Sequence, residues 1–340
     1  MLRLPACEVA NPRTVDQALA LLAEHGDAAM LIAGGTDLVP NMKHRLFEPE
    51  VLVSLERVPE LRGLREEDDG SLVIGAMTRL SELAASELVR AGAPALAQAV
   101  GIVAGPQLRN MGTLGGNVML DTRCQWYNQT YFWRKSLGFC LKKDGTDCHV
   151  VQGGSRCVAA ASNDSAPALT TLDAELRFVG PTGERRLPIE ELWSPDGTYN
   201  KRTSPQDLLV EVRLPPRPTG HRGAYGKLRD RGSIDFPLLG VAARLDLDGD
   251  GAVARADLVL TALQARPLRV KKRVDGLLGT RPGTEEFAEA LAAVCAQAHK
   301  QCHPMPNVPG DHEYRREMIP VYVRRTVLAA AEGAGPVQHL

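Results

Sequence analysis

The stretch Leu31-Ile-Ala-Gly-Gly-Thr-Asp-Leu38 decides the fold, because it places two glycines directly after a short buried strand predicted at 29–33. Glycine permits positive φ and close backbone approach, so consecutive N–H groups can point at a diphosphate. A second glycine-rich turn, Gly112-Thr-Leu-Gly-Gly-Asn117, has a Thr hydroxyl and an Asn amide beside it. Neither turn matches G-x-G-x-x-G or a Walker loop, which disfavours the Rossmann and P-loop folds. One such turn alone is usually only a tight turn, so the pair carries the argument.

Length and composition exclude several classes of protein. A chain of 340 residues suggests two or three compact units, and 44% apolar with 24% charged residues is ordinary for a globular protein. A net charge of −1 gives no electrostatic argument for a nucleic-acid or membrane partner. No apolar run approaches the roughly 20 residues that span a bilayer. The N-terminus lacks the apolar core of a secretory signal, so we expect a cytoplasmic protein.

Hydrophobic periodicity outlines the order of elements. The first half predicts a helix at 14–25, strands at 51–55 and 71–75, and an alanine-rich helical region at 79–104 that breaks near Gly92 and Pro94. A helix at 166–172, strands at 174–179 and 208–214, and a linker at 215–220 follow. The last third predicts strands at 223–229, 238–247 and 252–261, then helices near 266–278, 284–300 and 311–332.

The two turns, read as A-G-G-T-D-L and G-P-Q-x-R-N-x-G-T-L-G-G-N, resemble the medium, FAD-binding subunit of the xanthine dehydrogenase and carbon monoxide dehydrogenase family. The resemblance runs from about residue 5 to 330. It implies an α+β fold, with a two-subdomain FAD-binding domain of the vanillyl-alcohol-oxidase (PCMH) type over 1–217. A small α/β C-terminal domain like that of carbon monoxide dehydrogenase flavoproteins is expected over 222–332. The implied partners are a large molybdenum-cofactor subunit and a small [2Fe–2S] subunit, in a dimer of heterotrimers.

The same resemblance implies individual roles. Residues 31–38 are expected to wrap the FAD diphosphate through backbone amides, and residues 112–116 to supply the second diphosphate loop. Asp164 matches an acidic residue that hydrogen-bonds ribose hydroxyls. Lys227 matches a lysine near the isoalloxazine ring, where positive charge favours a reduced, anionic flavin. Val103 is expected near the adenine or ribityl region and Leu209 at the adenine. The implied FAD-binding set is Leu31, Ile32, Ala33, Gly34, Gly35, Thr36, Asp37, Leu38, Val103, Gly112, Thr113, Leu114, Gly115, Gly116, Asn117, Asp164, Leu209 and Lys227.

Four of the seven cysteines cluster in the irregular segment 121–160, namely Cys124, Cys140, Cys148 and Cys157. Their position differences of 16, 8 and 9 contain no CxxC pair, so neither a zinc ribbon nor a bacterial ferredoxin run fits. Four thiolates suit either zinc or a [4Fe–4S] cluster, and spacing alone leaves disulfides and free thiols open as well.

The residues around these cysteines resemble the insert in the β subunit of 4-hydroxybenzoyl-CoA reductase. They are Asp121-Thr-Arg-Cys-Gln-Trp-Tyr-Asn-Gln129, Trp133-Arg134, Gly138-Phe-Cys-Leu-Lys142, Gly145 and Cys148-His-Val150. The resemblance implies a [4Fe–4S] cluster on all four cysteines. His149 is a fifth candidate, although a role beside the cluster or at the surface is simpler. The aromatics Trp126, Tyr127, Tyr131, Phe132 and Trp133 are expected to form an apolar shell.

One motif is a decoy. Asp246-Leu-Asp-Gly-Asp-Gly251, with Asp257 at position 12, imitates an EF-hand loop. The flanking residues alternate as in strands, so we expect a hairpin turn.

No general acid–base pair or nucleophile is evident, so we expect no catalytic residue on this chain. The predicted function is electron transfer through FAD and the cluster, in an oxidoreductase most like 4-hydroxybenzoyl-CoA reductase, with reduced ferredoxin as a possible donor. One alternative is a xanthine dehydrogenase-like hydroxylase that passes electrons outward. The other is a non-catalytic protein that binds zinc or a nucleotide.

Overall fold

The computed structural model describes residues 2–338 and contains three sheets. The first is parallel, with strand order β1-β3-β2. Its strands are β1 (Glu8–Ala10), β2 (Ala29–Ile32) and β3 (Val51–Ser54). Helix α1 (Val15–His25) packs against it, with Thr14 accepting from the Gln17 N–H as the N-cap. Helix α2 (Leu38–Lys43) follows β2 and begins directly after the first glycine-rich turn.

The second sheet is antiparallel, with order β4-β5-β8-β6-β7. Its strands are β4 (Leu64–Glu66), β5 (Leu72–Gly75), β6 (Glu175–Gly180), β7 (Gly183–Pro188) and β8 (Leu208–Leu214). The helices between β5 and β6, except α8 of the insert, belong to its layer. They are α3 (Leu80–Ala85), α4 (Glu87–Gly92), α5 (Pro94–Gly101), α6 (Pro106–Arg109), α7 (Leu114–Val118) and α9 (Ser165–Thr171). Residues of β5, β6, β8, α5 and α9 bury their apolar side chains in one core.

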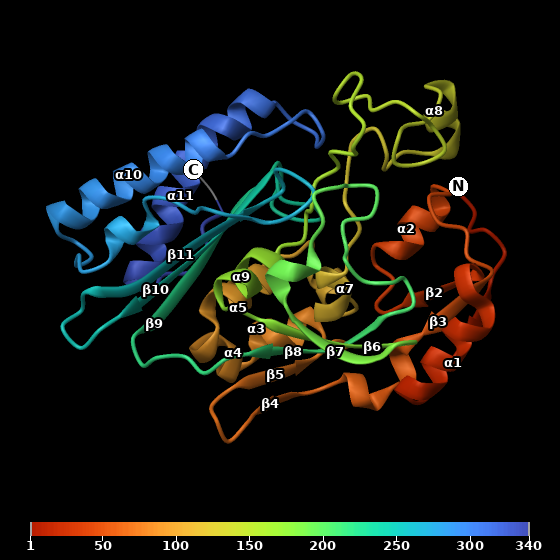
Figure 1. Ribbon diagram of the computed structural model, residues 1–340, viewed down its shortest axis with the longest axis horizontal. Coiled ribbons are helices and arrows are strands. Elements are labelled where there is room, and N and C mark those ends of the chain that lie inside the picture. The colour runs from red at the N-terminus through yellow and green to blue at the C-terminus, as the bar shows by residue number, and fades with distance from the viewer. Residues whose placement is uncertain (1, 339–340) are drawn as a thin grey trace.

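The third sheet is an antiparallel meander that forms the C-terminal part of the chain. It contains β9 (His221–Leu228), β10 (Leu239–Leu247), β11 (Val253–Thr261) and β12 (Leu268–Arg269). Helices α10 (Glu285–Gln301) and α11 (His312–Glu332) lie together on one side of this sheet, and α5 and α9 contact it from the side of the second sheet (Figure 1). The three sheets with their helices confirm the predicted α+β class. The domain boundaries at 1–217 and 222–332 stay a prediction.

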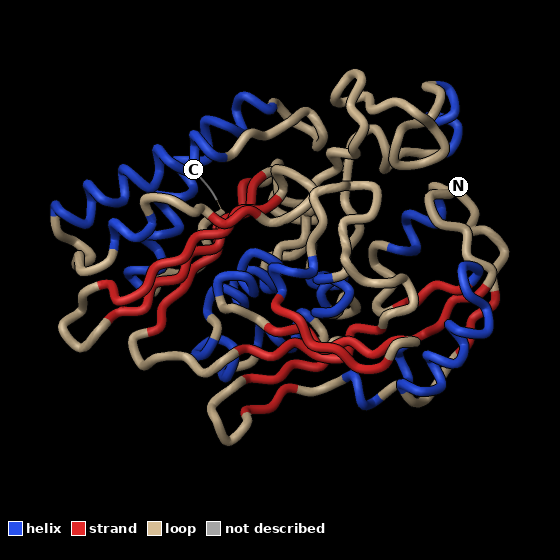
Figure 2. Tube along the Cα trace, viewed as in Figure 1, coloured by secondary structure: helices blue, strands red, loops and turns tan. Residues whose placement is uncertain are grey.

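The segment 121–160 projects from the body as one long excursion, almost wholly loop (Figure 2). Its only α-helix is α8 (Tyr131–Ser136). Arg123 and Ala160 pair across its neck, with N–H···O distances of 2.8 Å in both directions. The irregular character that the sequence predicts for this insert is therefore confirmed.

Three stretches of the structure can be compared with the elements that the sequence predicts. The helix near 266–278 is wrong: Leu268 and Arg269 pair with β11 as β12, and Arg273 is left-handed at φ +69°, so only a single 3-10 turn (Val274–Leu277) forms after it. The second glycine turn is in part a helix, since α7 begins inside it at Leu114. The EF-hand likeness is a hairpin turn as expected, with the Asp248 carboxylate accepting from Asp250 and Ala252 N–H groups at 3.0 and 2.9 Å. No helix within 2–338 is long and apolar enough to cross a membrane.

Candidate flavin and cysteine sites

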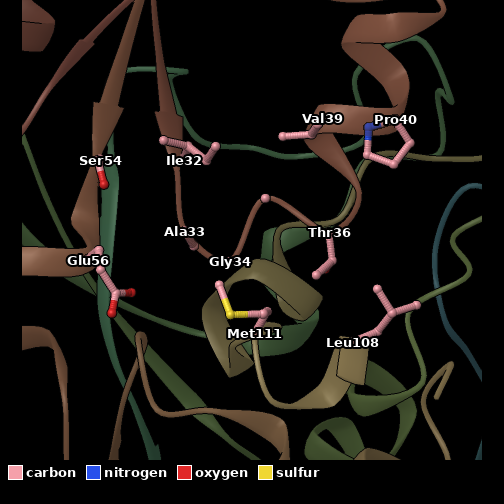
Figure 3. A pocket seen from close by; sticks show the side chains of 11 residues that line it. Ile32, Ala33, Gly34, Thr36, Val39, Pro40, Ser54, Glu56, Leu108 and Met111 are labelled. Carbon is pink, nitrogen blue, oxygen red and sulfur yellow. The ribbon is translucent and has the colours of Figure 1, made fainter. Parts of the chain in front are cut away.

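The two glycine-rich loops lie against each other. The first connects β2 to α2 and contains Gly35 at φ +69°, a left-handed conformation that favours glycine. A Cβ atom added at Gly34 would overlap the carbonyl oxygen of Met111, which directly precedes the second loop. Figure 3 shows Gly34 and Met111 side by side between the end of β2 and α2. Only glycine allows this close approach of two backbones.

The second loop is shaped by a helix cap and by tight packing. Thr113 is the N-cap of α7, and its hydroxyl accepts from the Gly116 N–H at 3.1 Å. An added Cβ at Gly115 would stand 2.8 Å from the Ala76 Cβ and 2.9 Å from its carbonyl oxygen. Gly115 is therefore required by packing against the chain after β5, whatever the loop binds.

A cavity of about 520 Å³ opens at the first loop (Figure 3). Five of the expected FAD-binding residues line it: Ile32, Ala33, Gly34, Gly35 and Thr36. The rest of the wall comes from α2, the end of β3 with the chain after it, and the approach to the second loop. These segments contribute Val39, Pro40, Ser54, Glu56, Leu108 and Met111. The crowded Gly34 and the left-handed Gly35 fit a group that is held by backbone amides rather than by side chains.

Other expected residues lie away from this cavity. Leu209 in β8 is 4% exposed and belongs to the main core, against which the partly buried Val103 also packs. Leu31 packs in the core of the first sheet. Asn117 connects the second loop to the residue after Asp164. Its side-chain oxygen accepts from the N–H and the hydroxyl of Ser165 at 3.1 and 2.6 Å.

Asp164 and Lys227 form a buried ion pair. The Lys227 ammonium lies 3.2 Å from the Asp164 carboxylate and donates to the carbonyl oxygens of Ile102 and Asp235 as well. The Tyr225 hydroxyl donates to Asp164 at 2.9 Å. Burial raises the pKa of Asp164, while the charge of Lys227 acts in the opposite direction. The structure brings together the two residues that the sequence had singled out separately, and it adds Tyr225, which no motif had indicated.

The cysteines of the insert gather around one small apolar cluster. Cys124, Cys140 and Cys157 are buried together with Tyr127, and Cys148 is half-buried. All seven cysteines are free thiols, so the disulfide alternative fails.

Burial shifts the pKa of two of these thiols, Cys124 and Cys157. It raises the pKa of Cys124 to about 12, and charges on Cys157, Cys140 and Cys148 raise it further. The pKa of Cys157 rises to about 11, again through burial first, with smaller contributions from Cys148 and Cys140.

His149 and the aromatic residues do not all behave as expected. His149 lies 2.5 Å through Nε2 from the carbonyl oxygen of Phe139, and a carbonyl can only accept, so Nε2 carries the proton. Trp126 and Tyr127 pack at the cysteine cluster, and Trp133 stacks on Trp126 with ring centroids 5.9 Å apart. Phe132 is 81% exposed and is not part of an apolar shell, because it occupies the outward side of α8.

Two cations anchor the insert, and sequence reasoning missed both. Arg123 donates through Nη1 to the Asp37 carboxylate at 2.6 Å and lies 3.8 Å above the Phe236 ring. Lys142 donates to Asp121, Thr122 and the carbonyl oxygens of Gly197 and Thr198, at 2.6 to 3.1 Å. No spacing in the sequence signals either contact, since each joins segments that are distant along the chain.

The comparisons with known proteins agree with this geometry. Residues 5–217 match the family described as the FAD binding domain in molybdopterin dehydrogenase, and 223–330 match the CO dehydrogenase flavoprotein C-terminal domain. The carbon monoxide dehydrogenase medium chain of Hydrogenophaga pseudoflava is 31% identical over 96% of this chain and 97% of its own. The FAD-binding subunit PaoB of an Escherichia coli aldehyde oxidoreductase is 35% identical over 69% of this chain and 76% of its own.

A solved structure gives the same result. Carbon monoxide dehydrogenase from Hydrogenophaga pseudoflava, in a form lacking the Mo-pyranopterin moiety, superposes with a TM-score of 0.79 at 30% identity, covering 98% of this chain and all of its counterpart. The chain thus belongs to the FAD-binding medium-subunit family of the xanthine dehydrogenase and carbon monoxide dehydrogenase type of molybdenum hydroxylase, and is an oxidoreductase subunit.

Proposed function

We propose that the chain is the β-type subunit of a 4-hydroxybenzoyl-CoA reductase, which binds FAD and a [4Fe–4S] cluster and takes electrons from reduced ferredoxin. The reaction would consume electrons and protons, convert 4-hydroxybenzoyl-CoA to benzoyl-CoA, and release the phenolic oxygen as water. Substrate chemistry belongs to a large molybdenum subunit, with a small [2Fe–2S] subunit as the other partner. The assembly is a dimer of heterotrimers.

One observation carries the proposal: four cysteines, three of them in one buried cluster, lie in an insert whose neck is tied to the first glycine-rich loop. The tie is the ion pair between Arg123, the residue before Cys124, and Asp37, the last residue before α2. The gathered thiols and the loop cavity therefore share a framework, while the body of the insert extends outward (Figure 1). That arrangement suits a relay between the protein surface and a flavin.

Thiolates are the ligands that both zinc and a [4Fe–4S] core take, and Cys124, Cys140 and Cys157 lie in one buried cluster of side chains. As the side chains of residues 2–338 are placed, no three His, Cys, Asp or Glu groups stand close enough to share one metal ion. The resemblance of the insert to that of 4-hydroxybenzoyl-CoA reductase is what favours the iron–sulfur cluster. Trp126, Tyr127 and Val150 pack around the thiols and would limit solvent access to a cluster.

When bound, the cluster supplies one-electron transfer and FAD supplies transfer in steps of one or two electrons. The residues of this chain would hold the two cofactors and limit their contact with solvent. Gly34 and Gly35 allow backbone approach at the cavity, and Lys227 keeps a positive charge in the interior next to Asp164. Lys142 fixes the neck of the insert near Cys157, whose pKa its charge lowers in opposition to burial.

The second candidate is a hydroxylase that passes electrons outward. The named relatives favour it, since they are dehydrogenase and oxidoreductase subunits. A hydride acceptor that reacts at the flavin needs no relay through an outlying insert, whereas a one-electron donor benefits from one. The insert therefore favours the inward direction.

The test uses the complex purified from its native host. It should contain a molybdenum chain and a [2Fe–2S] chain, and reduced ferredoxin should reduce its flavin in stopped-flow measurements. Cys148→Ser should slow that reduction by at least about tenfold, because its thiol is proposed to ligate the entry cluster. Flavin reduction at the wild-type rate in this variant would contradict the proposed electron relay through the cluster. Efficient oxidation of an aromatic substrate with NAD as acceptor would favour the hydroxylase instead.

A further inference from the structure

A closed set of hydrogen bonds links the neck of the insert to the beginning of α2. Arg123 Nη1 donates to Asp37 Oδ1 at 2.6 Å, and Asn41 Nδ2 donates to Asp37 Oδ2 at 2.9 Å. Asn128 Nδ2 donates to Asn41 Oδ1 at 3.3 Å, while its Oδ1 accepts from the Cys124 N–H at 3.0 Å. Cys124 follows Arg123 in the chain, so the path returns to its origin. We call these residues the polar ring.

The polar ring is part-buried, with Asn41 as its most buried member. Asn41 is 4% exposed, and the side chains of Arg123 and Asp37 retain only 21% and 26% of their surface. Its members come from two segments that are distant in sequence, the beginning of α2 and the neck of the insert. A buried polar network whose members satisfy one another specifies a single arrangement more than it adds net stability.

A second clamp lies at the other end of α2. Arg134 in α8 is 1% exposed, and its Nη2 donates to the carbonyl oxygens of His44 and Arg45 at 3.2 and 3.0 Å. These carbonyls lie at and just beyond the C-terminal end of α2, where cations are favourable. The insert therefore holds α2 at both ends.

Helix α2 also forms part of the flavin cavity. Val39 and Pro40, in its first turn, line the cavity together with Gly34 and Gly35. The same short helix therefore follows the glycine-rich loop that is expected to wrap the diphosphate. It also carries Asn41, which is linked to the Cys124 N–H through the side chain of Asn128.

We propose that α2 and the polar ring couple the two cofactor sites, so that filling the flavin site organises Cys124 and filling the cysteine site strengthens flavin binding. Asn41 and Asn128 are positioning residues in this device. The inference rests on the proposed function, because it takes Cys124 as a cluster ligand. Coupling between sites is reciprocal, so the ratio of FAD affinities with and without the cluster measures it in both directions.

The test compares FAD affinity of the full chain with and without a reconstituted cluster. In the wild type, the cluster-loaded chain should bind FAD at least about fivefold more tightly than the iron-free chain. Asn128→Ala removes both ring contacts of that side chain and should bring the ratio near one. Asn128→Asp keeps the acceptor for the Cys124 N–H but loses the donor to Asn41, and should lower the ratio as well. Gln125→Ala is the matched control, because Gln125 lies in the same insert and bonds to Pro306 instead.

Iron content and the spectrum of the reduced cluster are recorded first, so that failures are distinguishable. A wild-type chain that takes up no cluster overturns both the cluster and the coupling. A loaded wild type with a ratio of one overturns the coupling alone. The coupling is likewise overturned if Asn128→Ala retains the wild-type ratio, or if Gln125→Ala lowers it equally.

Discussion

The ammonium of Lys227 and the carboxylate of Asp164 stand 3.2 Å apart with 0% and 3% of their side chains exposed. Lys227 comes from β9 and Asp164 from the start of α9, so this pair joins the C-terminal sheet to the segment that follows the insert. The Asp235 carboxylate also lies 3.7 Å from the Lys227 ammonium, and the charge of Arg229 acts on Asp164, so the pair belongs to a small buried group of charges. Removing only one partner of such a buried ion pair strongly destabilises the folded protein.

Lys227→Met should therefore lower the free energy of unfolding by about 3–5 kcal/mol, because Asp164 remains buried without its cation. Denaturant unfolding measures the change. The double variant Lys227→Met with Asp164→Asn is the control and should recover much of the loss, since no lone charge remains. A single variant as stable as the wild type would show that Asp164 is neutral without its partner.

Gly34→Ala should abolish retention of FAD. The added Cβ collides with the Met111 carbonyl oxygen, so the two glycine-rich loops have to separate. Gly249→Ala is the control, because no atom lies within 4 Å of its added Cβ and its φ is not in the left-handed region. Flavin absorbance per chain after purification is the measurement. Full flavin content in Gly34→Ala would show that the contact between the loops is not needed for binding.

Cys140→Ser should remove about four irons per chain and leave flavin binding largely in place, weakened only by the lost coupling. Iron analysis and the spectrum of the reduced protein test this, with Cys7→Ser as the matched control outside the insert. Stoichiometric zinc in the wild type, or iron unchanged in Cys140→Ser, would contradict the proposed ligand set.

Asp257 should make stability depend on pH. Burial raises its pKa to about 6, although Arg269 lies 3.2 Å away and acts in the opposite direction. An unfolded Asp titrates near ~3.9, so between about pH 4 and 6 the unfolded chain releases a proton that the folded chain retains. The stabilisation is present below pH 4 and is lost as pH rises through 6.

Asp257→Asn cannot lose this proton. Its stability relative to the wild type should therefore rise by about 1–3 kcal/mol between pH 4 and pH 7, as one pKa unit corresponds to about 1.4 kcal/mol. Urea unfolding of both proteins at the two pH values gives the difference, in which all other titrations cancel. A difference that does not change with pH would show that folding does not raise the pKa of Asp257.

Local sequence determined the features that need only neighbouring residues. The glycines at 34 and 35 specify a turn after β2 because only glycine tolerates the required φ and crowding. The strand predicted at 208–214 is β8 to the residue, and the break predicted near Gly92 and Pro94 falls between α4 and α5. Four cysteines in one irregular segment predicted a site of shared chemistry. The turn and the two elements were predictable because propensity and sterics act over a few residues, whereas a shared site on the four cysteines stays a prediction.

Tertiary structure alone decided which distant residues meet. The sequence indicated neither the contact of Arg123 with Asp37 nor the bond of Asn128 to Asn41, since each pair is more than 80 residues apart. It also did not indicate that Lys227 would be fully buried against Asp164, rather than a solvated lysine on a strand. Such partners are chosen when sheets and helices pack, because a buried charge or amide must find its complement wherever the fold presents one.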